Sequence, residues 1–362
     1  MAATLIDWDF ALATAVRLVK SGPDAEPGEA AEVVDALRAG AARSEGPVRE
    51  FTGLEASSAT APVLVVDRPG WIAANVAAFS SILAPLLAKV SDAAEEKGQT
   101  PGPVARGVGS RVTGAEVGAA LAFMSTKVLG QFDPFFTPAT ASATPDAPVA
   151  GRLMLVAPNV LHVERTLDVD PDDFRLWVCL HEETHRVQFT AVPWMRPHIE
   201  SLVAELVEAT EVDSEGVARS LSEVGRAAGR IARGEKVSLV ELMQNDAQRA
   251  AVARITGVMS LLEGHADVVM DGVGPSVIPS VKAIRRKFDQ RRKGEGLVDR
   301  LLRQVLGLDA KMKQYRDGAA FVRAVEKKAG RAAFDAVWAG PENLPSAEEI
   351  EDPDRWVRRV HG

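Results

Sequence analysis

The chain has 362 residues, of which 46% are hydrophobic and 25% are charged, so it can bury a large core as one big domain or as two of moderate size. Its formal net charge of −8 argues against nucleic-acid binding, because neutralising phosphates requires a basic surface. The single cysteine, Cys179, excludes an internal disulfide and a cysteine-based zinc site. Any metal must therefore be held by histidine and carboxylate.

No membrane-spanning or export segment is predicted. The purely apolar runs are much shorter than the roughly 20 residues that a membrane-spanning helix needs. The first residues, Met1 to Trp8, lack the basic start and the apolar core of a signal peptide. We therefore expect a cytoplasmic protein without a membrane partner.

Helices are predicted for most of the first part of the chain. Residues 8–42 predict two helices, because Ala, Val and Leu recur there at helical spacing. Asp67 can cap a third helix that has Pro69 in its first turn, and another long helix follows the Gly-Pro segment at 98–107. None of these helices carries a catalytic pattern.

Residues 131–151 form the clearest break, because their prolines and threonines favour neither a helix nor a sheet. We place a soft boundary there, between an N-terminal helical region at 1–135 and a metal-binding region at 136–362. A single compact unit would fit the composition as well. Two short strands are then predicted at 152–157 and 161–165, bridged by Pro158 and Asn159.

An H-E-x-x-H motif, His181-Glu182-Glu183-Thr184-His185, follows in an apolar run that predicts a helix capped by Asp170. Residues four apart share one helix face, so His181 and His185 can offer two imidazole nitrogens to one Zn²⁺. Glu182 is offset from them, and its carboxylate can take a proton from a zinc-bound water. Alternatively, both histidines are core-edge residues bonded to carbonyl groups.

A catalytic zinc site usually has three protein ligands and an open position for water. One known arrangement places a third histidine six residues after the second, but that position holds Ala191. Another arrangement uses a glutamate on a separate downstream helix, and Glu263 fits it. Gly264 beside this glutamate would allow two helices to approach closely.

Three further residues are candidates for the same site. His265 competes with Glu263 as the third ligand, but side chains two positions apart on a helix diverge, so we favour Glu263. Asp267 lies one turn after Glu263 and could accept the free ring N–H of a metal-bound histidine. His265 and Tyr315, the only tyrosine, are candidate donors to the oxyanion that develops in amide hydrolysis.

Each of these interpretations has a plain structural alternative. The group from Glu263 to Asp267 could be a buried polar network that only ties helices together. Tyr315 could be an amphipathic side chain at a helix surface. The basic segment at 282–293 could be a solvated helix face, or a patch that attracts an anionic substrate. The strands at 152–157 and 161–165 are candidates for an edge strand that pairs with an extended substrate.

These features resemble a known family. They are the motif segment 181–189, the Glu-Gly-His-Ala run at 263–266, and the C-terminal residues Lys311, Gln314, Tyr315, Trp338, Leu344 and Pro345. The combination is similar to the actinobacterial zincin-like family assigned as zinc-dependent metalloproteases, whose members are often labelled as associated with deazaflavin-coenzyme biosynthesis. The resemblance covers the chain from Trp8 to its end.

The resemblance implies a mainly α fold, with a zincin-like metallohydrolase core and a small β element before the metal helix. The family pattern matches His181, Glu182, His185 and Glu263. The leading hypothesis is a zinc metallopeptidase, in which Glu182 activates a water on Zn²⁺ held by the other three residues. Alternatives are a non-catalytic helical scaffold or partner-binding protein that retains the metal site, and a hydrolase of a small anionic amide. The oligomeric state is not predicted.

Overall fold

The computed structural model describes residues 5–55, 63–96, 98, 102–136, 151–209, 245–294 and 308–362, without the side chains of 291–294 and 308–316. In these ranges the protein is mainly helical with a small three-stranded sheet, so the predicted fold class is confirmed. Residues 214–234, whose sequence also predicts a helix, lie outside the described residues.

The chain divides into two compact units. Unit 1 comprises Met1–Glu45, Ser58–Glu183 and Val212–Val217, and unit 2 comprises Gly46–Ser57, Thr184–Glu211 and Ala218–Gly362. The division passes through one continuous helix, α6 (Pro171–Thr190). The predicted boundary at residue 135 adjoins residues 137–150, which are not described, and it stays a prediction.

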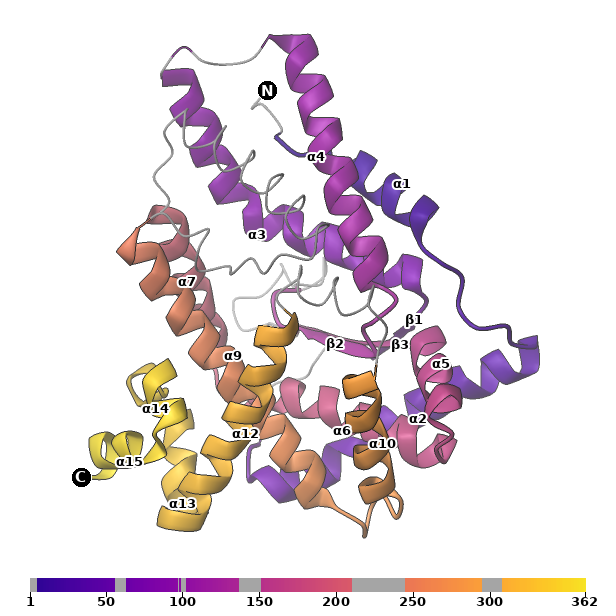
Figure 1. Ribbon diagram of the computed structural model, residues 1–362, viewed down its shortest axis with the longest axis vertical. Helices are drawn as coiled ribbons and strands as arrows, with labels where there is room; N and C mark the ends of the chain where they lie inside the picture. The colour runs from indigo at the N-terminus through magenta and orange to yellow at the C-terminus, as the bar shows by residue number, and fades with distance from the viewer. Residues whose placement is uncertain are drawn as a thin grey trace, which may run out of the picture. The chain divides into compact units, whose positions relative to one another are not determined.

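Unit 1 contains three strands and the helices around them (Figure 1). Besides the first part of α6, its elements are α1 (Trp8–Leu18), most of α2 (Pro27–Thr52), β1 (Leu64–Val66), α3 (Arg68–Glu96), α4 (Pro103–Met124), β2 (Gly130–Asp133), β3 (Arg152–Val156) and α5 (Ala157–Leu167). The helices predicted in this part are confirmed, and Asp67 caps α3 by accepting a hydrogen bond from the Gly70 amide at 2.7 Å.

The sheet of unit 1 has the order β1-β3-β2. β1 pairs with β3 in parallel, with Leu64 opposite Met154, and β2 pairs with β3 antiparallel, with Phe132 opposite Leu153. The inner face of β3 joins α1, α3 and α4 in a core that includes Trp71 and Ile72. The strand predicted at 152–157 is thus confirmed as β3, but it is the central strand rather than an edge.

The strand predicted at 161–165 is wrong, because these residues belong to α5. Pro158 stands in the first turn of this helix, where its missing N–H has no partner to lose. The buried residues Val160, Val163, Glu164 and Leu167 follow helical spacing. The proline that suggested a turn between two strands therefore begins a helix.

α3 is the one described helix that is long and apolar enough to cross a membrane, by length and composition only. Of its most apolar 18-residue window, 22% is buried. A single helix of this kind is weak evidence, because core helices of soluble proteins meet the same criteria. The expected cytoplasmic location stays a prediction.

Unit 2 is helical in its described residues. After the second part of α6, its elements are α7 (Met195–Glu208), α9 (Asp246–Val273), α10 (Val281–Gly294), α12 (Leu308–Ala329), α13 (Arg331–Phe334), the 3₁₀ turns η3 (Asp335–Trp338) and η4 (Pro341–Asn343), α14 (Ala347–Glu351) and α15 (Pro353–His361).

The central contact of unit 2 is the packing of α12 along α9 (Figure 1). A Cβ atom on Gly264 would lie 2.1 Å from the carbonyl carbon of Gly318, and one on Gly318 would lie 1.9 Å from the Ser260 oxygen. No side chain fits at such distances, so the two backbones touch where both helices have glycine. The close approach expected at Gly264 is therefore made with α12.

Candidate metal centre

Helix α6 presents the H-E-x-x-H motif as the sequence predicts. Asp170 Oδ1 accepts a hydrogen bond from the Asp173 amide at 3.0 Å, which caps the helix, and Pro171 is its first residue. The apolar residues ahead of the motif are buried, and Phe174 and Leu180 are fully so. This anchored stretch holds the motif in a fixed rotation about the helix axis.

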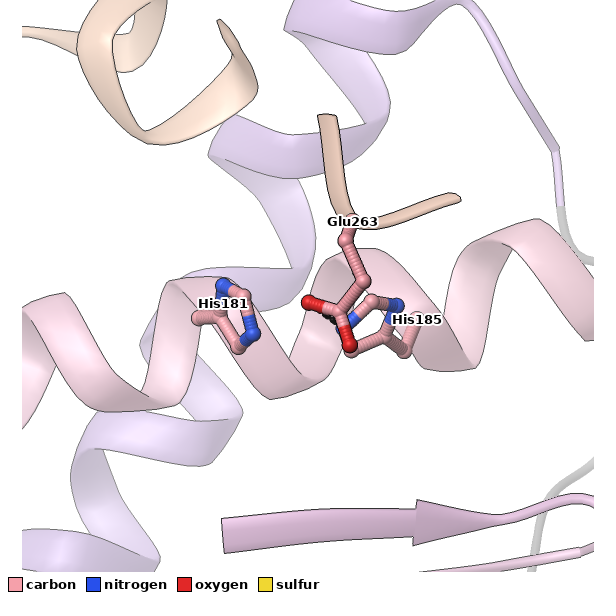
Figure 2. Close-up of side chains that lie close together, drawn as sticks. All are labelled: His181, His185 and Glu263. Atoms are coloured by element: carbon pink, nitrogen blue, oxygen red, sulfur yellow. Dashed lines mark ion pairs between the residues drawn. The ribbon is translucent and has the colours of Figure 1, made fainter. Parts of the chain in front are cut away.

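Three predicted residues meet at this helix. Ligand atoms of His181, His185 and Glu263 all lie within 4.8 Å of one another, and His185 Nε2 is 3.5 Å from Glu263 Oε2. Figure 2 shows both imidazole rings on one face of α6 and the Glu263 carboxylate reaching them from α9. All three side chains are half-buried. Glu263, rather than His265, completes the group.

Glu182 lies beside the edge strand β2. Its side chain is only 6% exposed. A Cβ atom on Gly130, the first residue of β2, would lie 2.5 Å from Glu182 Cγ and 2.8 Å from Oε1. The carboxylate therefore occupies the space that a side chain at position 130 would need. β2 was not predicted, since its four residues fall at the edge of the break assigned to 131–151.

Gln188 contacts His185 from the same helix. Its Oε1 lies 2.9 Å from His185 Nδ1, and its Nε2 lies 2.9 Å from the Leu262 oxygen and 2.9 Å from His265 Nδ1. The glutamine is completely buried. The sequence analysis did not single it out, although a glutamine three residues after a candidate ligand, on the same helix face, was the available signal.

His265 is enclosed by aromatic side chains. It is 1% exposed, and its ring lies 5.6 Å from that of Phe334 and 5.0 Å from that of Trp338, measured between centroids. Burial, with smaller contributions from Arg331 and His185, lowers its pKa to about 3, so the ring is neutral. Because Nδ1 faces Gln188, the predicted role as an oxyanion donor would have to use Nε2, and it stays a prediction.

Asp267 pairs with an arginine of α10, and Tyr315 lies in α12. Asp267 Oδ1 accepts a hydrogen bond from Arg285 at 2.9 Å, and Arg285 also donates to Asp271 at 2.9 Å. At His185, Nδ1 faces Gln188 Oε1 at 2.9 Å, and the predicted bond from a metal-bound histidine to Asp267 stays a prediction. Tyr315 belongs to α12, but its side chain is outside the described residues.

Cys179 is a packed thiol in the core of unit 1. It is fully buried, and its Sγ donates to the Leu37 oxygen at 3.6 Å. Burial, reinforced by the charges of Glu182 and Glu183, raises the thiol pKa. A thiol held in its neutral form neither attacks a substrate nor binds a metal.

Two comparisons with known proteins cover nearly the whole chain. The model of the zincin-like metallopeptidase family matches residues 6–357. A crystal structure from Chloroflexus aurantiacus, of a protein described as a "putative hydrolase with a novel fold", shares 29% sequence identity and a TM-score of 0.67, covering 98% of both chains. No curated protein matches. Both matches include α6 and α9, the helices of the candidate metal centre.

Proposed function

Because the chain belongs to the zincin-like metallopeptidase family, we propose that it is a zinc-dependent hydrolase of peptides. The observation that carries this proposal is the convergence of His181, His185 and Glu263. Two imidazoles and one carboxylate form a donor set typical of catalytic zinc, with the fourth position open to water.

The geometry of the three residues suits zinc. Tetrahedral zinc with bonds of about 2.0 to 2.2 Å places neighbouring ligand atoms roughly 3.4 Å apart. The distance of 3.5 Å between His185 Nε2 and Glu263 Oε2 matches this separation. The site therefore requires little rearrangement of the ring and the carboxylate to hold the ion.

Glu182 is suited to move the proton. When bound, zinc would acidify a water and stabilise the charge on a developing oxyanion. The Glu182 carboxylate, one residue after a ligand and buried beside β2, would accept the proton of that water and pass it to the leaving amine nitrogen. An extended peptide could pair with the backbone of β2 next to this carboxylate.

Two substitutions test the assignment. We expect Glu263→Ala to lose most bound zinc, measured by metal analysis of the purified protein, because two ligands hold zinc much less tightly than three. We expect Glu182→Gln to keep its zinc and to lose cleavage of a peptide library. Glu200→Ala, an exposed acidic residue on α7, is the control for both. Full zinc occupancy in Glu263→Ala would exclude it as a ligand.

The same experiment addresses the alternatives. A non-catalytic scaffold predicts a wild-type protein that binds zinc and cleaves neither peptides nor small amides. Recruitment of an anionic amide by the basic segment at 282–293 is less favoured, because Arg285 is already paired with Asp267 and Asp271. Screening small anionic amides beside peptides separates that alternative from peptidase activity.

A further inference from the structure

We propose that Gln188 is a positioning residue that fixes the tautomer of His185, so that the lone pair of Nε2 faces the metal position. The inference rests on the proposed zinc site and adds to it a residue that contacts neither the metal position nor a substrate. The inference follows from three hydrogen bonds of the Gln188 side chain, one of which is accepted by a backbone carbonyl.

The backbone carbonyl determines which way the Gln188 amide faces. The Leu262 oxygen can only accept hydrogen bonds, so the Gln188 atom 2.9 Å away must be the NH₂ group. Oε1 is then the atom that lies 2.9 Å from His185 Nδ1. The reversed amide would set two oxygens against each other at Leu262, which is costly for a fully buried side chain.

The amide orientation determines the tautomer of His185. Oε1 of Gln188 can only accept, so Nδ1 of His185 must carry the proton. A neutral imidazole protonated on Nδ1 has its lone pair on Nε2. Nε2 is the atom that lies 3.5 Å from Glu263 Oε2. The ring is thus prepared to bind a cation between itself and that carboxylate.

Gln188 also connects the two helices that supply ligands. Its NH₂ group donates to Leu262, the residue before Glu263 on α9, and its second N–H meets Nδ1 of His265. A carboxylate at position 188 could accept from His185 but could not donate to Leu262. An amide can do both, which gives a physical reason for glutamine here. His265 thereby supports the amide, held in turn by Phe334 and Trp338.

The first test is the tautomer of His185 in the metal-free protein. Nitrogen-15 spectra of the labelled histidines, with His185 assigned by its loss in His185→Gln, should show a protonated Nδ1 and a bare Nε2. This measurement needs neither zinc nor a substrate. A proton on Nε2 in the wild type would overturn the proposal.

The second test is zinc affinity, measured by competition with a chelator. Gln188→Met keeps the size of the side chain and removes its hydrogen bonds, so we expect zinc affinity to fall by about 10- to 100-fold. Gln188→Glu keeps the acceptor, so His185 should retain its Nδ1 proton and the affinity should exceed that of Gln188→Met. Thr190→Val is the control, because it also removes a polar group from α6, a hydroxyl that donates to the Arg186 oxygen at 2.7 Å.

These outcomes separate the proposal from the proposed function. A folded Gln188→Met with wild-type zinc affinity would overturn the positioning role. If Gln188→Met does not fold, the wild-type tautomer and Gln188→Glu still decide the question. A protein that has the predicted tautomer and binds zinc, but cleaves no peptide, would keep this inference and refute the peptidase.

Discussion

Helices α6 and α9 supply the candidate metal centre in different ways. α6 carries His181, Glu182 and His185 within five residues, so the helical repeat alone sets their relative directions. α9 supplies Glu263, whose place depends on how α9 packs with its neighbours, above all at Gly264 against α12. The motif half of the site is therefore local, whereas the glutamate half depends on the tertiary structure.

The largest expected effect comes from disturbing the packing of α9, on which the position of Glu263 depends. Gly264→Ala would put a Cβ atom 2.1 Å from the Gly318 backbone, so α9 and α12 must separate. We expect a loss of about 3 kcal/mol in unfolding free energy, measured in urea, together with weaker zinc binding. Alanine is intrinsically more favourable than glycine within a helix. A loss of stability in Gly264→Ala would therefore come from the contact with α12.

Gly257→Ala is the matched control on the same helix. Its Cβ atom would meet the Pro345 oxygen at 3.1 Å, a contact that a small shift relieves. We expect its unfolding free energy to stay within about 1 kcal/mol of the wild type. Equal stability of the two variants would show that the contact between Gly264 and Gly318 does not hold α9 in place.

A smaller change tests the half of the site around α6. Gly130→Ala would place a Cβ atom 2.5 Å from Glu182 Cγ, so the carboxylate must move. If Glu182 is the general base, a displacement of about 1 Å should lower kcat roughly 100-fold. Zinc content should remain unchanged, because Glu182 is not among the three clustered ligands.

Gly109→Ala, on α4, is the control for Gly130→Ala because a Cβ atom there meets nothing within 4 Å. Both variants are compared by metal analysis and by steady-state hydrolysis of a peptide that the wild type cleaves. Unchanged kcat in Gly130→Ala would mean that the position of this carboxylate does not limit the reaction. Lost zinc would mean instead that β2 supports the ligands themselves.

The same contrast explains what the sequence could predict. The spacing of the motif indicates α6 and its two histidines, and the divergence of side chains two apart favours Glu263 over His265; Glu263 is the residue whose carboxylate lies close to both histidines. The partner of a buried polar group depends on tertiary packing, so neither the contact of Gln188 with His185 nor that of Asp267 with Arg285 was predicted.

The sheet was harder to predict than the motif. β2 has four residues, Gly130 to Asp133, and its pairing partner β3 begins at Arg152. Such a short strand carries no alternating pattern of its own, so only its pairing with β3 defines it. Pro158 led to the wrong prediction of a second strand at 161–165. A proline between two apolar runs fits a turn as well as the first turn of a helix.

The smallest expected effect concerns the packing of α14 against α9. Glu349 accepts hydrogen bonds from Arg359 at 2.7 Å and from the Ser346 amide at 2.9 Å, completing the capping box of α14. Burial raises the pKa of Glu349, but the hydrogen bonds from Arg359 and the Ser346 amide, with the charges of Arg359 and Arg355, outweigh it, so the pKa is lowered from 4.5.

A carboxyl whose pKa is lower in the folded state stabilises the fold above its unfolded pKa and loses this contribution as the pH falls through its folded pKa. We therefore expect Glu349→Gln to lower the unfolding free energy by about 1 kcal/mol at pH 7. The difference from the wild type should shrink as the pH falls below 4.5. Zinc affinity at pH 7 should not change, since α14 touches α9 near Gly257, about two turns before Glu263. A clear loss of zinc would show that the contact of α14 with α9 also determines the position of Glu263. The site would then depend on packing along the whole of α9.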